Sequence, residues 1–137
     1  VPALMGSELL RNNEEVYVTS SIGLGLSTPD VSLPLQWTHE YKHGENLPTQ
    51  KRDDIIPGEV LGLVKLRCCC ADKLSVTILD QYSTFTRHFE QYQNFYTFPY
   101  DWRRDLNETT DALLSTLAKI KQKHGQPAQV VSHSMGC

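Results

Sequence analysis

The last residues of the chain place a serine among the small neighbours that a nucleophilic serine needs. The segment reads Val130-Val131-Ser132-His133-Ser134-Met135-Gly136-Cys137, so an apolar run that predicts a strand leads into Ser134. Ser132 and Gly136 lie two positions before and after it. Small residues there let a strand and a following helix approach closely around a tight turn that exposes the serine at its apex. The pattern predicts a serine nucleophile for acyl transfer, and a plain Ser/Gly turn after a buried strand is the alternative.

Two helices are predicted before this turn. Apolar residues four, seven and eleven positions after Ile78 predict a first helix, for which Asp80 is a suitable N-cap. A second helix is predicted over residues 106–124, where Asp105 and Glu108 resemble a capping box. Its end is marked by Gly125 and then Pro127, and its apolar stripe consists of Leu113, Leu114, Leu117 and Ile120.

Three apolar segments predict strands between and before these helices. They are residues 1–4, residues 94–98 and residues 128–132. Alternation of helix and strand implies parallel strands joined by right-handed crossovers. The chain is therefore expected to form a three-layer α/β arrangement in which these strands are neighbours, with residues 128–132 in the centre and chemistry at their carboxyl end.

The first half of the chain is less regular. Residues 14–20 predict a short strand, and residues 60–70 predict a strand or an extended crossing segment. Residues 21–58 show little periodicity and many Gly, Pro, Ser and Thr residues. So long an excursion from a compact domain is usually functional, for example as a lid or a substrate-binding segment.

Composition limits the classes of protein to consider. The chain has 137 residues, which fits one domain, and 39% apolar residues, which suits a globular chain. Its net charge of −3 argues against nucleic acid as a partner. No apolar run approaches the roughly 18 residues of a membrane span, although peripheral membrane contact is allowed. The consecutive Cys68, Cys69 and Cys70 lack metal-ligand spacing, so neither a metal nor another cofactor is expected.

Three segments together resemble one family of α/β-hydrolases, the lecithin:cholesterol acyltransferase-like enzymes. Residues 1–9, Val-Pro-Ala-Leu-Met-Gly-Ser-Glu-Leu, resemble the family's P-G-x-x-G-S-x-L segment. Residues 98–105, Phe-Pro-Tyr-Asp-Trp-Arg-Arg-Asp, resemble its P-Y-D-W-R signature, and residues 131–136 resemble its G-H-S-M-G turn. The motifs stand in the family's order and cover nearly the whole chain. The resemblance implies that residues 1–137 are the N-terminal part of one α/β-hydrolase domain, from the oxyanion loop to the nucleophile.

The resemblance also implies roles for individual residues. Ser134 is the expected nucleophile, and the backbone N–H groups of Leu4 and Met135 are the expected oxyanion-hole donors. Asp101, Trp102 and Arg103 follow a predicted strand end, and we interpret them as a structural cluster near the site, with Asp101 paired to Arg103 or Arg104. The implied substrate is a lipid ester, whose acyl group passes through an acyl-enzyme to water or an alcohol.

Two departures from the family pattern leave other interpretations open. Ala3 and Ser132 each stand where the family has Gly, and the acidic and histidine partners of the serine are expected after the turn, beyond Cys137. His133 adjoins Ser134 but is expected to pack beside the turn rather than act as its base. The chain looks like an incomplete piece without a signal peptide. The alternatives are a truncated, non-catalytic remnant or pseudo-enzyme of the same fold, and a carboxylesterase.

Overall fold

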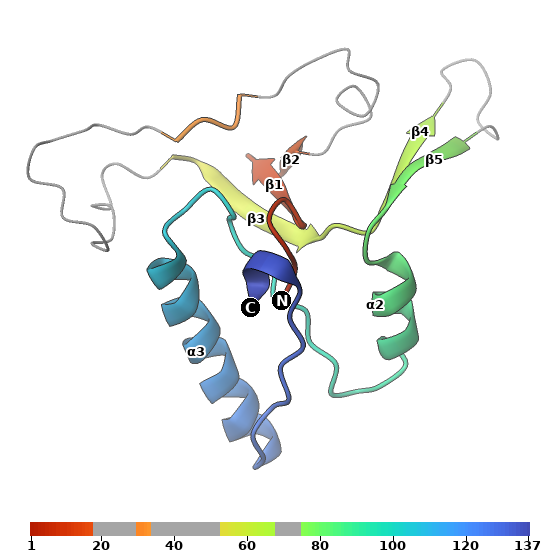
Figure 1. Cartoon of the computed structure of the whole chain (residues 1–137). Coiled ribbons are helices and arrows are strands. Elements are labelled where there is room, and N and C mark those ends of the chain that lie inside the picture. Colours follow the sequence, from red (N-terminus) through yellow and green to blue (C-terminus); the bar gives the residue numbers. More distant parts are fainter. Residues whose placement is uncertain (18–29, 34–52, 68–74) are drawn as a thin grey trace, which may run out of the picture.

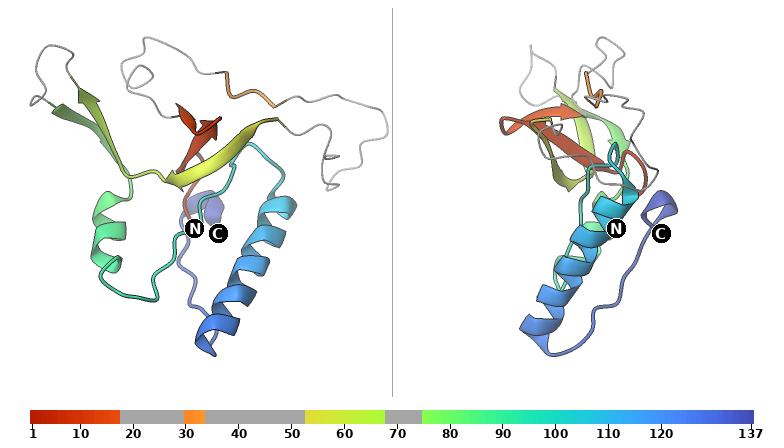
Figure 2. Two further views of the ribbon diagram at one scale, coloured as in Figure 1. Left: turned by 180° about the vertical axis from the view of Figure 1, so that it is seen from behind. Right: turned by 90° about the vertical axis from the view of Figure 1, so that its left-hand side faces the viewer.

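The structure is a computed structural model that describes residues 1–17, 30–33, 53–67 and 75–137. Its strands form two antiparallel sheets, one with three strands and one with two. Helices α2 and α3 both lie on the same side of these sheets (Figures 1 and 2). The two ends of the chain meet between the helices and the three-stranded sheet, so residues separated by most of the sequence share one region (Figure 1).

The three-stranded sheet is built around its amino-terminal strand. It contains β1 (Ser7–Arg11), β2 (Glu14–Tyr17) and β3 (Ile55–Val60), in the order β2-β1-β3. The turn between β1 and β2 has positive φ at both of its central residues, Asn12 (54°) and Asn13 (66°). Asparagine tolerates this conformation, whose twist suits a tight hairpin. The short strand predicted within residues 14–20 is thus confirmed over Glu14–Tyr17.

The second sheet corrects the prediction of a helix starting at Ile78. Its strands are β4 (Leu63–Arg67) and β5 (Ser75–Asp80), and helix α2 spans only Ser83–Phe89. The helical spacing was misleading because a cross-strand partner was available, and pairing with β4 holds residues 75–80 in a ladder. The prediction of Asp80 as the N-cap is wrong, because Tyr82 occupies that position without a capping side-chain hydrogen bond. The Asp80 carboxylate nevertheless accepts a hydrogen bond from the N–H of Ser83, the first residue of the helix, at 3.1 Å. Cys68, Cys69 and Cys70 lie outside the described residues.

Helix α3 (Leu106–His124) confirms the prediction made for residues 106–124. The Asp105 carboxylate accepts a hydrogen bond from the Asn107 N–H at 2.8 Å. At the other end Gly125 adopts the left-handed conformation, with φ of 70°, and its N–H donates to the carbonyl of Lys121. Most of the predicted apolar stripe is half-buried, but Leu114 is 59% exposed and does not belong to the buried face.

The three strands predicted at residues 1–4, 94–98 and 128–132 are wrong as regular strands. These residues carry no strand assignment, and the described sheets are antiparallel. A strand needs a neighbour for its backbone groups, and residues 94–98 do not pair with residues 128–132. The arrangement is therefore compatible with part of a three-layer α/β fold without displaying its parallel sheet. The excursion predicted for residues 21–58 ends earlier, because β3 begins at Ile55. Residues 21–29 and 34–52 of this excursion lie outside the described residues.

The most buried side chains surround β1. Ser7 and Leu9 are fully buried, and Tyr100 is 4% exposed. The Ser7 hydroxyl accepts a hydrogen bond from the Tyr100 N–H at 3.0 Å, and the Ser7 carbonyl accepts one from the Trp102 indole at 3.2 Å. The hydroxyl and the carbonyl of Ser7 thus both attach residues 100–102 to the sheet.

We expect Ser7→Ala to destabilise the fold by about 1–3 kcal/mol, because the buried Tyr100 N–H would lose its acceptor. Urea denaturation of the 137-residue chain measures this change. Ser115→Ala, at an exposed position of α3, is the matched control and should change stability by less than about 0.5 kcal/mol. Equal effects of the two substitutions would show that the Ser7 hydroxyl does not hold residues 100–102.

Candidate active site

The turn after residues 128–132 has the strained apex that a nucleophilic serine occupies. Ser134 has φ of 54°, an uncommon value for a residue other than glycine. It begins the short 3-10 turn η2 (Ser134–Gly136), which is closed by hydrogen bonds from Gly136 N–H to His133 O and from Cys137 N–H to Ser134 O, both 3.0 Å. The Ser134 side chain is exposed. The backbone thus changes direction at the serine and presents it to solvent.

Gly136 is required at its position by steric contact with the start of the chain. A Cβ atom added there would lie 2.4 Å from the Pro2 carbonyl oxygen and 2.8 Å from that of Val1. Such distances are not available to a real Cβ atom, so the turn packs on residues 1–2 only because this residue has no side chain. The small residue predicted two positions after the serine therefore has a physical reason.

Ser132, the other small residue of the motif, has no such constraint. It is not among the residues with positive φ, and its side chain is exposed, with the hydroxyl 3.5 Å from the Cys137 sulfur. The departure from Gly at this position therefore introduces no backbone strain. The same holds for Ala3, which is buried and has no positive φ.

Two hydrogen bonds join the amino-terminal residue to the segment before the turn. The amino group of Val1 donates to the Val131 carbonyl at 2.8 Å, and the Val1 carbonyl accepts from the His133 N–H at 3.2 Å. In a pair of parallel strands, the N–H and C=O groups of one residue bond to the two residues on either side of its partner. Two of the predicted strands are therefore adjacent and parallel at this point, although neither extends into a ladder.

The predicted oxyanion loop is a tight turn over residues 3–6. The Gly6 N–H donates to the Ala3 carbonyl at 3.0 Å, and Met5 has φ of 59°. The Ala3 carbonyl belongs to the same peptide unit as the Leu4 N–H, so this hydrogen bond fixes the plane of the predicted donor. Leu4 is 48% exposed. Contact between residues 1–2 and Gly136 brings this loop to the turn that carries Ser134 and Met135.

His133 is engaged by a residue that the sequence did not single out as functional. Its Nδ1 lies 2.8 Å from the hydroxyl oxygen of Tyr82, and the two rings meet edge to face with centroids 5.9 Å apart. The same hydroxyl accepts the Ala3 N–H at 2.9 Å. In the sequence Tyr82 was only one of the regularly spaced apolar residues of the first predicted helix. That spacing gives no sign that its hydroxyl makes hydrogen bonds to two distant segments.

Asp101 and Arg103 form a nearly buried charge cluster. The Arg103 guanidinium contacts Asp101 at 2.6 Å and Asp53 at 2.8 Å, and its side chain is 4% exposed. It also donates to the Val31 carbonyl at 3.2 Å. Burial disfavours its charge, but hydrogen bonds and attraction from the two carboxylates raise its pKa above the ordinary range, so Arg103 stays protonated.

Trp102 and Arg104 complete this region with contacts of their own. Trp102 packs edge to face on Tyr17 with ring centroids 5.1 Å apart, besides its hydrogen bond to Ser7. Arg104 pairs with Glu108 at 3.0 Å, so Arg103 is the partner of Asp101. The contacts of residues 101–103 run to β1, β2 and residues 31 and 53, and they support the fold behind the site.

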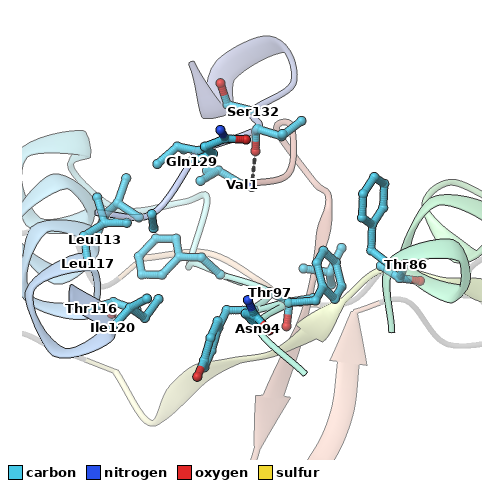
Figure 3. A pocket seen from close by; sticks show the side chains of 18 of the residues that line it. Val1, Thr86, Asn94, Thr97, Leu113, Thr116, Leu117, Ile120, Gln129 and Ser132 are labelled. Carbon is cyan, nitrogen blue, oxygen red and sulfur yellow. Dashed lines mark hydrogen bonds between the residues drawn. The ribbon is translucent and has the colours of Figure 1, made fainter. Parts of the chain in front are cut away.

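A cavity of about 760 Å³ lies next to the serine turn. Figure 3 shows Leu113, Leu117 and Ile120 of α3 on one side of it and Thr86 of α2 on the other. Residues 94–98 and 126–133 also line it, together with Val1, Pro2 and Val60. The lining thus reaches Ser132 and His133, directly before Ser134. The volume is in the range of sites for small ligands, and most of the side chains that line it are apolar.

Comparison with known families agrees with this geometry. The family model described as lecithin:cholesterol acyltransferase matches residues 73–137. Residues 73–137 are thus similar to the lecithin:cholesterol acyltransferase family. The resemblance stated from the sequence motifs is thereby confirmed, and the match includes helices α2 and α3, residues 98–105 and the serine turn. No curated protein and no solved structure matches the chain.

The match to this family supports an α/β-hydrolase fold and acyltransferase- or lipase-like chemistry on lipids. In the described parts of the chain, no group of three or more His, Cys, Asp or Glu side chains is placed to hold a metal ion. The helices described here include none with the length and apolar character needed to cross a bilayer.

We expect Gly136→Ala to detach the serine turn from residues 1–2, because its Cβ would overlap the Pro2 carbonyl. Overpacking of this kind costs about 1–3 kcal/mol. Amide hydrogen exchange at His133, whose N–H is bonded to Val1, should accelerate. Gly62→Ala is the control, since its Cβ would meet only Ser83 at 3.9 Å. Unchanged exchange at His133 in the Gly136 variant would contradict the packing described here.

Asp53→Asn should cost about 1–3 kcal/mol, because it removes the charge from a hydrogen bond to the buried Arg103. The neighbouring Asp54 gives a matched control. Its ion pair with Arg11 is exposed, so Asp54→Asn should cost less than about 1 kcal/mol. Both values come from denaturation of the same chain, and a cost for Asp54→Asn equal to that for Asp53→Asn would show that burial of the Arg103 cluster is unimportant.

Proposed function

We propose that this chain carries the nucleophile and the oxyanion site of a lipid O-acyltransferase or lipase, with Ser134 attacking the ester. The observation that carries the proposal is the positive φ of Ser134 in a turn pressed against residues 1–2. A non-glycine residue keeps such a conformation only where its surroundings enforce it, and such strain is concentrated at functional sites. An incidental Ser/Gly turn has no need of such a strained backbone.

The oxyanion of the tetrahedral intermediate would be bound by two backbone donors. Met135 N–H follows the nucleophile at the start of η2, and Leu4 N–H belongs to the turn at residues 3–6. Both stand on segments that Gly136 brings into contact. Removing one such donor from a serine hydrolase costs about 3 kcal/mol of transition-state stabilisation.

The cavity supports a lipid acyl chain as the bound group. Its apolar wall is formed by α2, α3 and residues 94–98, and it ends beside Ser132 and His133. An acyl chain lying there would have its ester carbonyl near Ser134, with the alcohol portion toward solvent. The acyl-enzyme forms when Ser134 Oγ bonds to the carbonyl carbon and the alcohol leaves with a proton, and water or a second alcohol then releases the acyl group.

The general base is expected outside the described residues. His133 Nδ1 is occupied by the Tyr82 hydroxyl, and adjacent residues on a sharp turn point in different directions. In the family's chain order, the acidic and histidine partners follow the turn. A protonated serine hydroxyl without its base is a weak nucleophile, so residues 1–137 alone are expected to be nearly inert toward esters.

Two alternatives predict different behaviour. A carboxylesterase would use the same serine but show no preference for long acyl chains. A non-catalytic remnant or pseudo-enzyme would bind apolar ligands in the cavity and never hydrolyse them. Comparing nitrophenyl esters of short and long acyl chains, and measuring fatty-acid binding without turnover, separates these alternatives from a lipid acyltransferase or lipase.

The test of the nucleophile uses a longer form, read on past Cys137 through an acidic residue and a histidine. This form should hydrolyse nitrophenyl esters, and Ser134→Ala in it should lower kcat by about 10⁶-fold, as loss of a catalytic serine does in the best-studied protease. Ser115→Ala, on the exposed side of α3, should retain full activity. Full activity in the Ser134→Ala form would show that another group is the nucleophile. Strong, Ser134-dependent turnover by residues 1–137 alone would show that the base lies within them.

A further inference from the structure

One phenol joins the two segments that the proposed chemistry requires. The Tyr82 hydroxyl oxygen is 2.9 Å from the Ala3 nitrogen and 2.8 Å from His133 Nδ1. Ala3 is the residue before the proposed donor Leu4, and His133 is the residue before the proposed nucleophile Ser134. These partners are separated from Tyr82 by 79 and 51 residues, so the contact is a tertiary one.

The direction of the hydrogen bond to Ala3 follows from the donor present. A backbone N–H can only donate, so Ala3 uses one lone pair of the Tyr82 oxygen. The second hydrogen bond joins the Tyr82 hydroxyl and His133 Nδ1, and the tautomer of the imidazole decides which of the two atoms donates. In either tautomer this hydrogen bond holds the His133 ring at the Tyr82 hydroxyl.

Tyr82 is itself firmly placed at the start of helix α2. Its carbonyl accepts hydrogen bonds from Thr86, through the backbone N–H at 2.9 Å and the hydroxyl at 3.1 Å. The next residue, Ser83, is 9% exposed, and its N–H donates to the Asp80 carboxylate. The phenol therefore extends from a hydrogen-bonded first turn of α2, which supports the contact with Ala3 and His133.

We propose that Tyr82 is a positioning residue of the acyl-transfer site, which ties the oxyanion loop to the serine turn through its hydroxyl. This inference rests on the proposed function. Tyr82 fixes the peptide unit before Ala3, and the Gly6 N–H fixes the next one, whose N–H belongs to Leu4. On the other segment Tyr82 fixes the His133 side chain, while Val1 fixes the His133 backbone. The segments that carry the two proposed donors and the nucleophile are thus both held by one atom, the Tyr82 hydroxyl oxygen.

The structural arm of the test uses Tyr82→Phe in the 137-residue chain. This change removes the hydroxyl and keeps the ring. Amide exchange at Ala3 should become at least about tenfold faster, and the ring ¹⁵N shifts of His133 should change because its Nδ1 loses the hydroxyl partner. Amide shifts of Leu4 and Met135 should move with them. Tyr17→Phe is the control, because that tyrosine is half-buried and its ring contact with Trp102 survives the change.

The kinetic arm uses the longer, active form. Misplacement of catalytic groups by about 1 Å costs roughly 10²-fold, so Tyr82→Phe should lower kcat by about 10- to 100-fold with KM nearly unchanged. If amide exchange at Ala3 and the ¹⁵N shifts of His133 are the same in Tyr82→Phe as in Tyr17→Phe, the Tyr82 hydroxyl does not join the two segments. If Tyr82→Phe changes the exchange at Ala3 and the shifts of His133 but does not lower kcat, the positioning role is overturned. If the hydrogen bonds of Tyr82 to Ala3 and His133 are present but the longer form is inactive, the proposed function is overturned. Tyr82 then has a structural role alone.

Discussion

Gly136 passes so close to the Pro2 carbonyl that no side chain fits between them. This contact, across nearly the whole sequence, holds the turn at Ser134 against the loop at residues 3–6. The two hydrogen bonds between Val1 and residues 131 and 133 set the direction of approach as parallel. Residues 128–132 have no other strand partner among the described residues, so the position of the serine depends on this one contact and on the Tyr82 junction.

A second set of contacts holds the opposite end of the same loop. Ser7 directly follows the loop and is fully buried, with its hydroxyl and carbonyl both bonded to residues 100–102. Arg103 extends this attachment to Asp53 and Val31, which flank the segment of residues 34–52. The loop of residues 3–6 is therefore fixed at its start by Tyr82 and Gly136 and at its end by Ser7. A loop held at both ends suits an oxyanion site, whose donors must be in place before charge develops.

The elements that the sequence predicted well are those whose signals are local. Helix α3 begins at the Asp105 cap and ends at Gly125 with φ of 70°, and both signals act within one turn of the helix. The strands predicted at residues 94–98 and 128–132 depended on partners distant in sequence, and periodicity cannot supply those. Residues 75–80 show the same limit in reverse, because pairing with β4 outweighed a helical spacing. Tyr82 was missed as a functional residue because a hydroxyl bonded to Ala3 and His133 leaves no pattern along the chain.

The two small residues of the serine motif are small for different reasons, and this changes how a departure from the pattern should be interpreted. At Gly136 the requirement is steric and comes from Pro2, so any side chain is excluded while the turn stays in contact with the start of the chain. At Ser132 the backbone has no positive φ and the side chain is exposed, so serine introduces no backbone strain there. Ala3, where the family has Gly, is likewise buried without a positive φ, and its N–H is bonded to Tyr82. Both departures therefore fall at positions where glycine's special freedom is unused, whereas Gly6 and Gly136, whose Cβ atoms would overlap their neighbours, are retained. The pattern of substitutions follows the local geometry, which is what a site that keeps its shape requires.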